Sequence, residues 1–243
     1  CDETIASVIE TEKTEFQRNY PKARIILSLS TASDAIQKLI NNEVEYIVSS
    51  RELDSNETDF LIRHDIQVYS QKFALDGVAI LVNSSNPLDE LRLDQLSKIL
   101  TGNYTNWRDI SDTIPFKTSK KQIQIVMDSR KSGNYTLIRN FVTDHAGIVA
   151  NAIVVSGDSI TGSAPKIMDF VAANENALGY LSTAWLGNNL EFITRLEKIK
   201  VLRLAATDMQ KAVDPIPGYV YRGDYPLRRV LYLMHRQQFA GLA

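Results

Sequence analysis

Apolar and polar residues follow one another along this chain in blocks that predict alternating strands and helices. Residues 78–82 form a continuous apolar run, which is typical of a strand covered on both faces. The polar residues 83–87 interrupt this run, and apolar residues then recur at helical spacing over 93–100. Gly102 follows the predicted helix, at a position where a helix end favours a residue that tolerates positive φ.

The same two patterns extend over the rest of the chain. Helical spacing of apolar residues predicts helices over residues 5–20, 35–40, 137–142 and 164–173. Short apolar runs predict strands over residues 24–29, 46–48, 66–73, 123–127, 153–155 and 177–181. A capping box at residues 54–57, Asp-Ser-Asn-Glu, predicts a further helix that ends near residue 63. This alternation indicates an α/β fold built from βα units, with mainly parallel sheets.

Size and charge narrow the class of protein. The chain has 243 residues, of which 44% are hydrophobic, so it can fill the core of one large α/β domain or of two ordinary ones. Its 27 Lys and Arg against 29 Asp and Glu give a net charge of −2. Such a balance provides no general basic field for nucleic acid or acidic membranes, so any anion site must be local. No apolar run approaches the ~20 residues of a membrane helix, which predicts a soluble chain.

Polar clusters stand between the end of a predicted strand and the start of a helix at three places. They are Ser30-Thr31 with Ser33, Ser49-Ser50-Arg51, and residues 132–136, Ser-Gly-Asn-Tyr-Thr. Helix N-termini present free N–H groups and a partial positive charge, and Ser, Thr and Asn add short donors there. This combination is suited to an anion, although for any single cluster helix capping alone is the favoured explanation.

Two arginines next to these clusters could supply charged contacts to an oxyanion. Arg51 and Arg130 each carry a planar guanidinium group that can bind such a ligand through two hydrogen bonds. The alternative is that each is a surface arginine surrounded by solvent.

Metal, disulfide and nucleophile chemistry find no support in the residue pattern. Cys1 is the only cysteine, so an internal disulfide is excluded and a cysteine zinc site is too. His64, His145 and His235 have no ligand spacing, and no Gly-x-Ser-x-Gly context for a nucleophile exists. We therefore predict no metal, no cofactor and no catalytic residues.

Residues 76–107 carry a specific family resemblance. They begin Asp-Gly-Val-Ala, run through Val-Asn-x-x-Asn-Pro into a helix, and end with a glycine followed by Asn-Trp. This order resembles the phosphate-binding proteins of bacterial phosphate ABC transporters. Residues 50–53, 130–136 and 225–232 are similar to further motifs of that family, so the resemblance spans almost the whole chain.

The resemblance implies a two-lobe type II periplasmic-binding-protein fold with a mainly parallel sheet in each lobe. A hinge of two crossing segments, near residues 74–76 and 182–190, would join the lobes. Residues 1–76 and 186–243 would form lobe 1, and residues 77–185 lobe 2. Residues 237–243 read as the start of a helix where the family continues, so we expect the C-terminal end of lobe 1 to be truncated.

The implied function is that of a solute-binding protein, not an enzyme. It would hold inorganic phosphate, or a similar oxyanion, between the lobes for delivery to an ABC permease. The implied ligand-binding residues are Thr4, Ser30, Thr31, Ser50, Arg51, Asp76, Arg130, Ser132, Asn134 and Thr136. The alternatives are a phosphate sensor or scavenging protein without a transport role, and a phosphoester hydrolase, for which the chain offers no nucleophile–base pair.

The family also implies an exported, periplasmic monomer. Cys1 is either the lipidated cysteine of a lipoprotein or an ordinary strand residue. The second interpretation is favoured because Asp2-Glu3-Thr4 follow at once instead of a flexible polar tether.

Four positions bear on which oxyanion binds. Asn134 and Tyr135 replace a serine and a glycine of the family pattern, and a tyrosine hinders close approach of the loop backbone to an anion. Asp76 could accept a proton from monohydrogen phosphate and repel fully ionised sulfate. The slightly favoured alternative is that Asp76 is a hydrogen-bonding residue of the hinge. Arg51 stands where many family members have an aspartate for this task, so selectivity against sulfate is not assured.

Overall fold

The computed structural model describes residues 1–110, 122–158, 161–187, 193 and 195–237. The strands are β1 Tyr46–Ser49, β2 Val68–Asn83, β3 Glu90–Arg92, β4 Gln124–Met127, β5 Ile153–Val154, β6 Ala177–Ser182, β7 Ile199–Ala205 and β8 Arg228–Arg236. The α-helices are α1 Ala6–Asn19, α2 Ala32–Ile40, α3 Ser55–Arg63, α4 Leu93–Leu100, α5 Gly133–Phe141, α6 Ala164–Ala173 and α8 Pro217–Arg222. Short 3₁₀ helices are η1 Glu3–Ile5, η2 Trp107–Asp109, η3 Thr183–Trp185 and η4 Leu196–Lys198.

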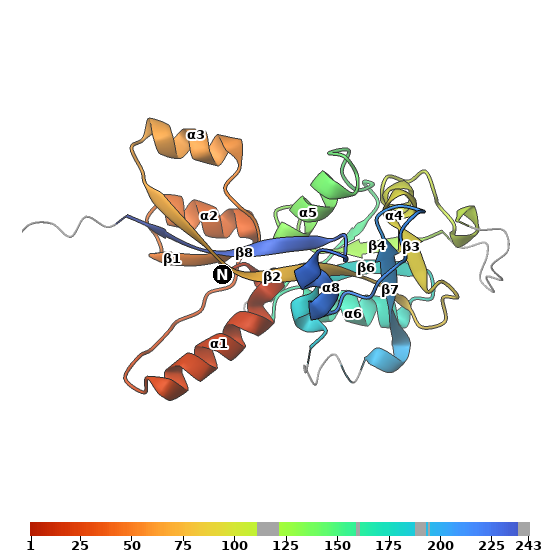
Figure 1. Ribbon diagram of the computed structural model, residues 1–243, viewed down its shortest axis with the longest axis horizontal. Helices are drawn as coiled ribbons and strands as arrows, with labels where there is room; N and C mark the ends of the chain where they lie inside the picture. Colours follow the sequence, from red (N-terminus) through yellow and green to blue (C-terminus); the bar gives the residue numbers. More distant parts are fainter. Residues whose placement is uncertain (111–121, 159–160, 188–192, 194, 238–243) are drawn as a thin grey trace, which may run out of the picture.

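One mixed sheet runs through the molecule in the order β1-β8-β2-β6-β4-β5, and β7 pairs with both β2 and β3. Its centre is a long antiparallel ribbon of β2 and β8 (Figure 1). At one end of this ribbon lie β1, α1, α2 and α3, and at the other lie β3 to β7 with α4, α5 and α6 (Figure 1). One buried apolar cluster lies at the end with α2 and β1, and another at the end with α4 and α5, whereas a third joins Ala6 of α1 to α6 and β6.

The predicted strand over residues 78–82 is confirmed as a strand buried on both faces. Val78, Ile80 and Val82 belong to one apolar cluster, whereas Leu81 belongs to another that contains Trp185. Successive side chains of a strand point to opposite faces, so the continuous apolar run reflects a core on each side.

The predicted helix ends at Gly102 and at the capping box are confirmed. Gly102 follows α4 with φ at +84°, and its N–H donates to the carbonyl of Ile99 at 3.1 Å. At the start of α3, Asp54 Oδ1 accepts from the N–H of Glu57 at 2.8 Å, and Glu57 Oε2 accepts from the N–H of Asp54 at 2.8 Å.

The predicted strand over residues 24–29 is wrong. This segment is extended but has no ladder, and only Ser28 and Ser30 exchange backbone hydrogen bonds with residues 1–3. Only Leu29 packs against a core cluster, whereas Ile26 is 83% exposed and Ile25 40% exposed. The apolar run alone was therefore an insufficient signal for a strand.

The sheet differs from the expected pattern in its directions. The predicted strands over 66–73 and 78–82 are parts of the single strand β2, so residues 74–76 lie inside a strand and not in a loop. β8 pairs antiparallel with β1 and with β2, and among the strands of the described residues the parallel pairs are β3/β7, β4/β5 and β4/β6. The α/β class is confirmed, but the sheet around β1 is antiparallel, because long neighbouring strands can pair in this way without a crossover helix.

The division at residues 76 and 186 remains a prediction. Part of the segment 186–243 contacts residues of the predicted lobe 2. β7 pairs with residues 80–83 of β2, and Leu202 and Val220 pack in the same apolar cluster as Trp107. Residues 188–190 of the predicted return crossing and residues 238–243 of the predicted terminal helix lie outside the described residues. Over the part that is described, no helix has the length and apolar character to cross a bilayer.

Candidate functional site

Three segments that are distant in sequence meet where the two groups of elements touch. They are η1 near the N-terminus, Ser50 directly after β1, and Gly133 at the start of α5. A Cβ atom added at Gly133 would lie 1.7 Å from Ser50 Oγ and 2.8 Å from Asp2 Oδ2. Glycine is therefore required here by close approach, and the start of α5 rests directly on the other two segments.

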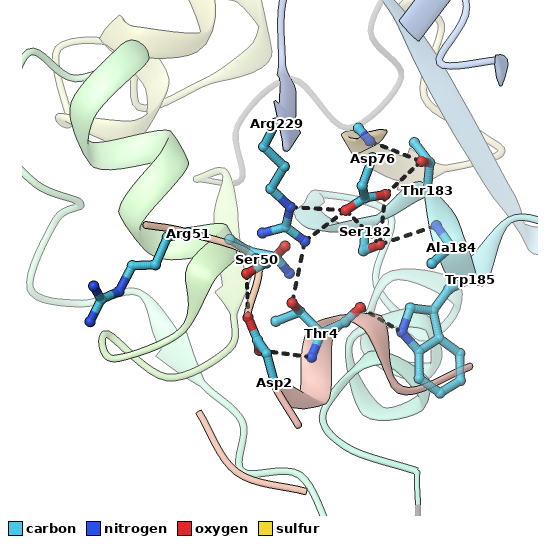
Figure 2. Close-up of polar contacts among 12 residues, drawn as sticks. Asp2, Thr4, Ser50, Arg51, Asp76, Ser182, Thr183, Ala184, Trp185 and Arg229 are labelled. Atoms are coloured by element: carbon cyan, nitrogen blue, oxygen red, sulfur yellow. Dashed lines mark hydrogen bonds and ion pairs between the residues drawn. The ribbon is translucent and has the colours of Figure 1, made fainter. Parts of the chain in front are cut away.

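The carboxylate of Asp2 lies at the centre of this meeting point. Asp2 is fully buried, and its Oδ1 accepts from the N–H of Thr4 at 3.1 Å as the N-cap of η1. Its Oδ2 accepts a hydrogen bond from Ser50 Oγ. Two donors predicted to bind an anion thus hold the carboxylate of Asp2 (Figure 2).

A buried ion pair adjoins Thr4 on the other side. Arg229 Nε and Nη2 lie 2.9 and 2.8 Å from Asp76 Oδ2, and Nη2 donates to Thr4 Oγ1 at 3.2 Å. Ser182 and Thr183 also donate to the carboxylate of Asp76, at 2.9 and 2.8 Å (Figure 2). Arg229 Nη1 is buried and has no hydrogen-bond partner among the described residues.

The start of α5 is organised by a second buried carboxylate, Asp128. It accepts from Ser132 Oγ at 2.7 Å and from Asn134 Nδ2 at 2.9 Å. Burial raises the pKa of Asp128 to about 7 against the effect of these hydrogen bonds, and the charges of Asp2 and Glu3 add to the rise. Asn134 Oδ1 is buried without a hydrogen-bond partner in the part of the chain that the structure describes.

Glu3 adds a third carboxylate to this region. Burial raises its pKa against a hydrogen bond from Ser163 Oγ at 3.2 Å, and the charges of Asp2 and Asp158 raise it further. The described residues contain no group of three or more His, Cys, Asp or Glu side chains that could hold a metal ion.

Arg51 directs its guanidinium group away from Asp2, Thr4 and Arg229 (Figure 2). Both terminal nitrogens lie 2.8 Å from the carboxylate of Glu57, and Nη2 donates to Ser33 Oγ at 3.1 Å. Burial lowers the pKa of Arg51, but the hydrogen bonds and charge of Glu57 outweigh this effect and raise it overall. Arg51 is therefore a half-buried, paired arginine and not a solvated one.

Arg130 is exposed and lies in the segment between β4 and α5. It donates to Tyr135 OH at 3.2 Å and to the carbonyls of Ile148 and Val149 at 3.4 Å, and its guanidinium carbon lies 5.6 Å from the centre of the Tyr135 ring. Tyr135, the residue that replaces the family glycine, thus holds Arg130 in place.

Several predicted site residues serve as helix caps or backbone contacts. Thr31 Oγ1 accepts from the N–H of Asp34 at 3.2 Å as the N-cap of α2, and Thr136 Oγ1 donates to the carbonyl of Ser132 at 3.0 Å. Ser30 reaches the site through its carbonyl, which accepts from the N–H of Glu3 at 2.8 Å.

The structure therefore brings together only part of the predicted set. Thr4, Ser50 and Asp76 share one hydrogen-bonded network, and Ser132 and Asn134 lie beside it on Asp128. Sequence reasoning missed Asp2, Asp128 and Arg229 as members. Signals for them did exist: Asp2 lies two residues before the predicted ligand Thr4, Asp128 directly follows a predicted strand, and Arg229 belongs to the family-like motif at 225–232.

Comparison with known proteins identifies the family. The model of the PBP superfamily domain matches residues 1–243. The phosphate-binding protein PstS of Staphylococcus haemolyticus is 25% identical over 236 residues, which are 97% of this chain and 69% of that protein. PstS of Staphylococcus epidermidis is 25% identical over 231 residues, 95% of this chain and 65% of that protein. The chain thus spans about two thirds of the length of these curated relatives.

Solved structures share the fold. A putative phosphate ABC transporter substrate-binding protein with bound phosphate from Clostridium perfringens gives a TM-score of 0.75 at 21% identity, covering 96% of this chain and 83% of that one. An ABC-type phosphate transport receptor from Vibrio cholerae gives 0.66 at 20% identity, covering 100% and 86%. These likenesses confirm the expected fold class, that of two-lobe binding proteins. With the match along its full length, the chain belongs to the PBP superfamily.

Proposed function

We propose that this protein is a solute-binding protein that captures inorganic phosphate, or a similar oxyanion, for delivery to an ABC permease. The relatives from Staphylococcus haemolyticus and Staphylococcus epidermidis are named as phosphate-binding proteins, and the Clostridium perfringens structure contains phosphate. These names describe binding and transport, which supports binding in preference to catalysis.

The observation that carries the proposal is the unpartnered nitrogen of Arg229. A buried polar group without a partner is costly, and the cost is larger for a charged group. Asp76 and Thr4 already use Nε and Nη2, so Nη1 is left to bind an acceptor. An oxygen of a phosphate-like anion would satisfy it with a charge-assisted hydrogen bond.

Further donors stand close to this nitrogen. The N–H of Thr4 and the hydroxyl of Ser50 both point at an oxyanion already, the carboxylate of Asp2. The start of α5 adds Ser132 and Asn134, whose donors now bond to the carboxylate of Asp128 and would have to turn from it to an anion. Arg51 and Arg130 remain proposed ligands, but each would first have to leave its present partners, Glu57 for one and two backbone carbonyls for the other.

Delivery to a permease implies that the protein works outside the cytoplasm. We therefore include export to the periplasm or cell envelope in the proposal, together with lipid anchoring through Cys1 and a monomeric state. Binding to both groups of elements at once would favour their closed arrangement, which is the form a permease could recognise.

Isothermal titration calorimetry with phosphate, sulfate, arsenate and molybdate tests the proposal. We expect one phosphate site per chain, and a rise in melting temperature with phosphate by mass action. Arg229→Lys keeps the charge but loses the planar fork, so it should weaken binding by about tenfold. Arg222→Lys, at an exposed ion pair of the same length, is the control and should not change it. Absence of binding for all four anions would show the proposal to be wrong.

A further inference from the structure

An aspartate side chain holds the donors of the proposed anion site. A carboxylate is itself an oxyanion, with two oxygens that accept hydrogen bonds. In Asp2, one oxygen accepts from the N–H of Thr4 at 3.1 Å and the other accepts from the hydroxyl of Ser50. The sequence predicts that Thr4 and Ser50 both bind an external anion. In the structure the carboxylate of Asp2, which belongs to the protein itself, takes the place of that anion.

The packing around Asp2 excludes a second anion on the same donors. The start of α5 closes against the carboxylate, because a single added carbon at Gly133 would lie 2.8 Å from Asp2 Oδ2. Asp2 is also fully buried. An oxyanion that accepts from Thr4 and Ser50 must therefore take the volume that the carboxylate fills now.

Charge also opposes simultaneous binding. Glu3 and Asp128 lie near enough to Asp2 for its charge to raise the pKa of both groups. The cation joined to this network, Arg229, is already paired with Asp76. A second anion beside an ionised Asp2 would thus add negative charge to a buried and already acidic region, where like charges interact strongly.

We infer that Asp2 is a built-in competitor: its carboxylate must leave Thr4 and Ser50 before an oxyanion can bind there, and it sets the affinity of the site. This inference rests on the proposed function. It predicts that the natural chain binds phosphate more weakly than the same chain without this side chain.

Asp2→Ala provides the direct test by calorimetry with phosphate. Removing the carboxylate frees both donors, so we expect phosphate affinity to rise by about tenfold or more. Glu3→Gln is the matched control, because it removes a neighbouring carboxylate that bonds to Ser163 and not to Thr4 or Ser50. Its effect should stay below about threefold.

Acetate gives a second readout that a purely structural role of Asp2 would not produce. In Asp2→Ala, acetate should replace the missing side chain, raise the melting temperature by mass action and compete with phosphate. In the natural chain, acetate should do neither. If Asp2→Ala does not fold, Asp2→Asn keeps the shape without the charge and should still tighten phosphate binding several-fold.

The outcomes separate the two proposals. If the natural chain binds phosphate and the folded Asp2 variants bind it equally or more weakly, Asp2 is a ligand contact or only a helix cap, and the inference is wrong. If neither the natural chain nor any folded variant binds phosphate, the proposed function itself fails. Acetate rescue in that case would still show that Asp2 fills a small-anion site.

Discussion

Asp76 and Arg229, 153 positions apart in the chain, form an ion pair with a separation of 2.8 Å and only 4% of each side chain exposed. Asp76 also accepts from Ser182 and Thr183, so its carboxylate is engaged as a hydrogen-bonding residue between β2, β6 and η3. Of the two roles open from the sequence, this geometry favours that of a hinge residue.

Loss of one partner of this pair should strongly destabilise the protein. Arg229→Ala leaves Asp76 buried without its counter-charge, which costs about 3–5 kcal/mol of unfolding free energy. Urea denaturation measures the change. Arg222→Ala is the control, because the Arg222–Asp224 pair has the same 2.8 Å separation but is about half exposed, and its loss should cost below about 1 kcal/mol. Equal losses in both variants would contradict the importance of burial.

Gly133→Ala should disturb the meeting point of α5 and β1. The new methyl group would overlap Ser50 Oγ, so either α5 or the segment after β1 must shift. We expect a loss of about 1–3 kcal/mol in stability and weaker phosphate binding. Gly187→Ala is the control, because its added carbon meets nothing within 4 Å. Double substitution with Ser50→Gly should recover part of the stability.

Asp128 should make stability fall as the pH rises from about 4 to about 7. The folded pKa of about 7 lies above the ordinary value near 3.9, so over this range the folded state retains a proton that the unfolded state releases. Asp128→Asn should remove this dependence and be more stable above pH 7, on the order of a few kcal/mol. Urea unfolding of both proteins at several pH values checks the difference. Parallel pH profiles would show that Asp128 does not titrate there.

If Arg51 binds phosphate, substitutions at Arg51 and at its partner Glu57 should change phosphate affinity in opposite directions. Arg51→Ala should then weaken binding by roughly 1.5–3 kcal/mol. Glu57→Gln keeps an oxygen for the capping box but weakens its hold on the guanidinium group, so it should tighten binding. Calorimetry on both variants decides the matter, and no change in either would remove Arg51 from the site.

Tyr135→Gly should release Arg130 from the tyrosine ring and hydroxyl, and it restores the backbone access that the family glycine provides. We expect tighter phosphate binding in the calorimeter, provided that the first turn of α5, which contains position 135, stays helical. Tyr135→Phe, which keeps the ring, should change affinity little. Abolished binding in Tyr135→Gly would instead make the tyrosine a ligand contact.

The sequence predicted correctly those helix ends and strands that depend on residues close to one another in the chain. The capping box of α3, the glycine after α4 and the apolar run of 78–82 each depend on residues within a few positions, and all three are confirmed. The predicted strand over 24–29 is wrong because Ile25 and Ile26 stay exposed and only Leu29 packs against a core cluster. The antiparallel pairing of β8 depends on residues some 150 positions away, which periodicity cannot reveal.

The candidate site shows the same limit. Thr4 and Ser50 were recognisable as donors beside predicted helix starts, but the side chain that they bind lies two residues from Thr4 and could not be placed from spacing. Arg229 looked like an ordinary strand residue in its motif. Its burial against Asp76 arises only when β8 pairs with β2.

The ribbon of β2 and β8 also sets the mechanics of the molecule. Its strands continue from one group of elements to the other. A movement of one group against the other must therefore twist or bend this hydrogen-bonded pair of strands. Phe73 lies opposite no residue of β8, because the register shifts between Lys72 and Ala74. Such an irregularity weakens the ladder locally. Bending between the two groups of elements should therefore concentrate near Phe73, where the β2/β8 ladder is interrupted, and should be resisted by the paired residues on either side.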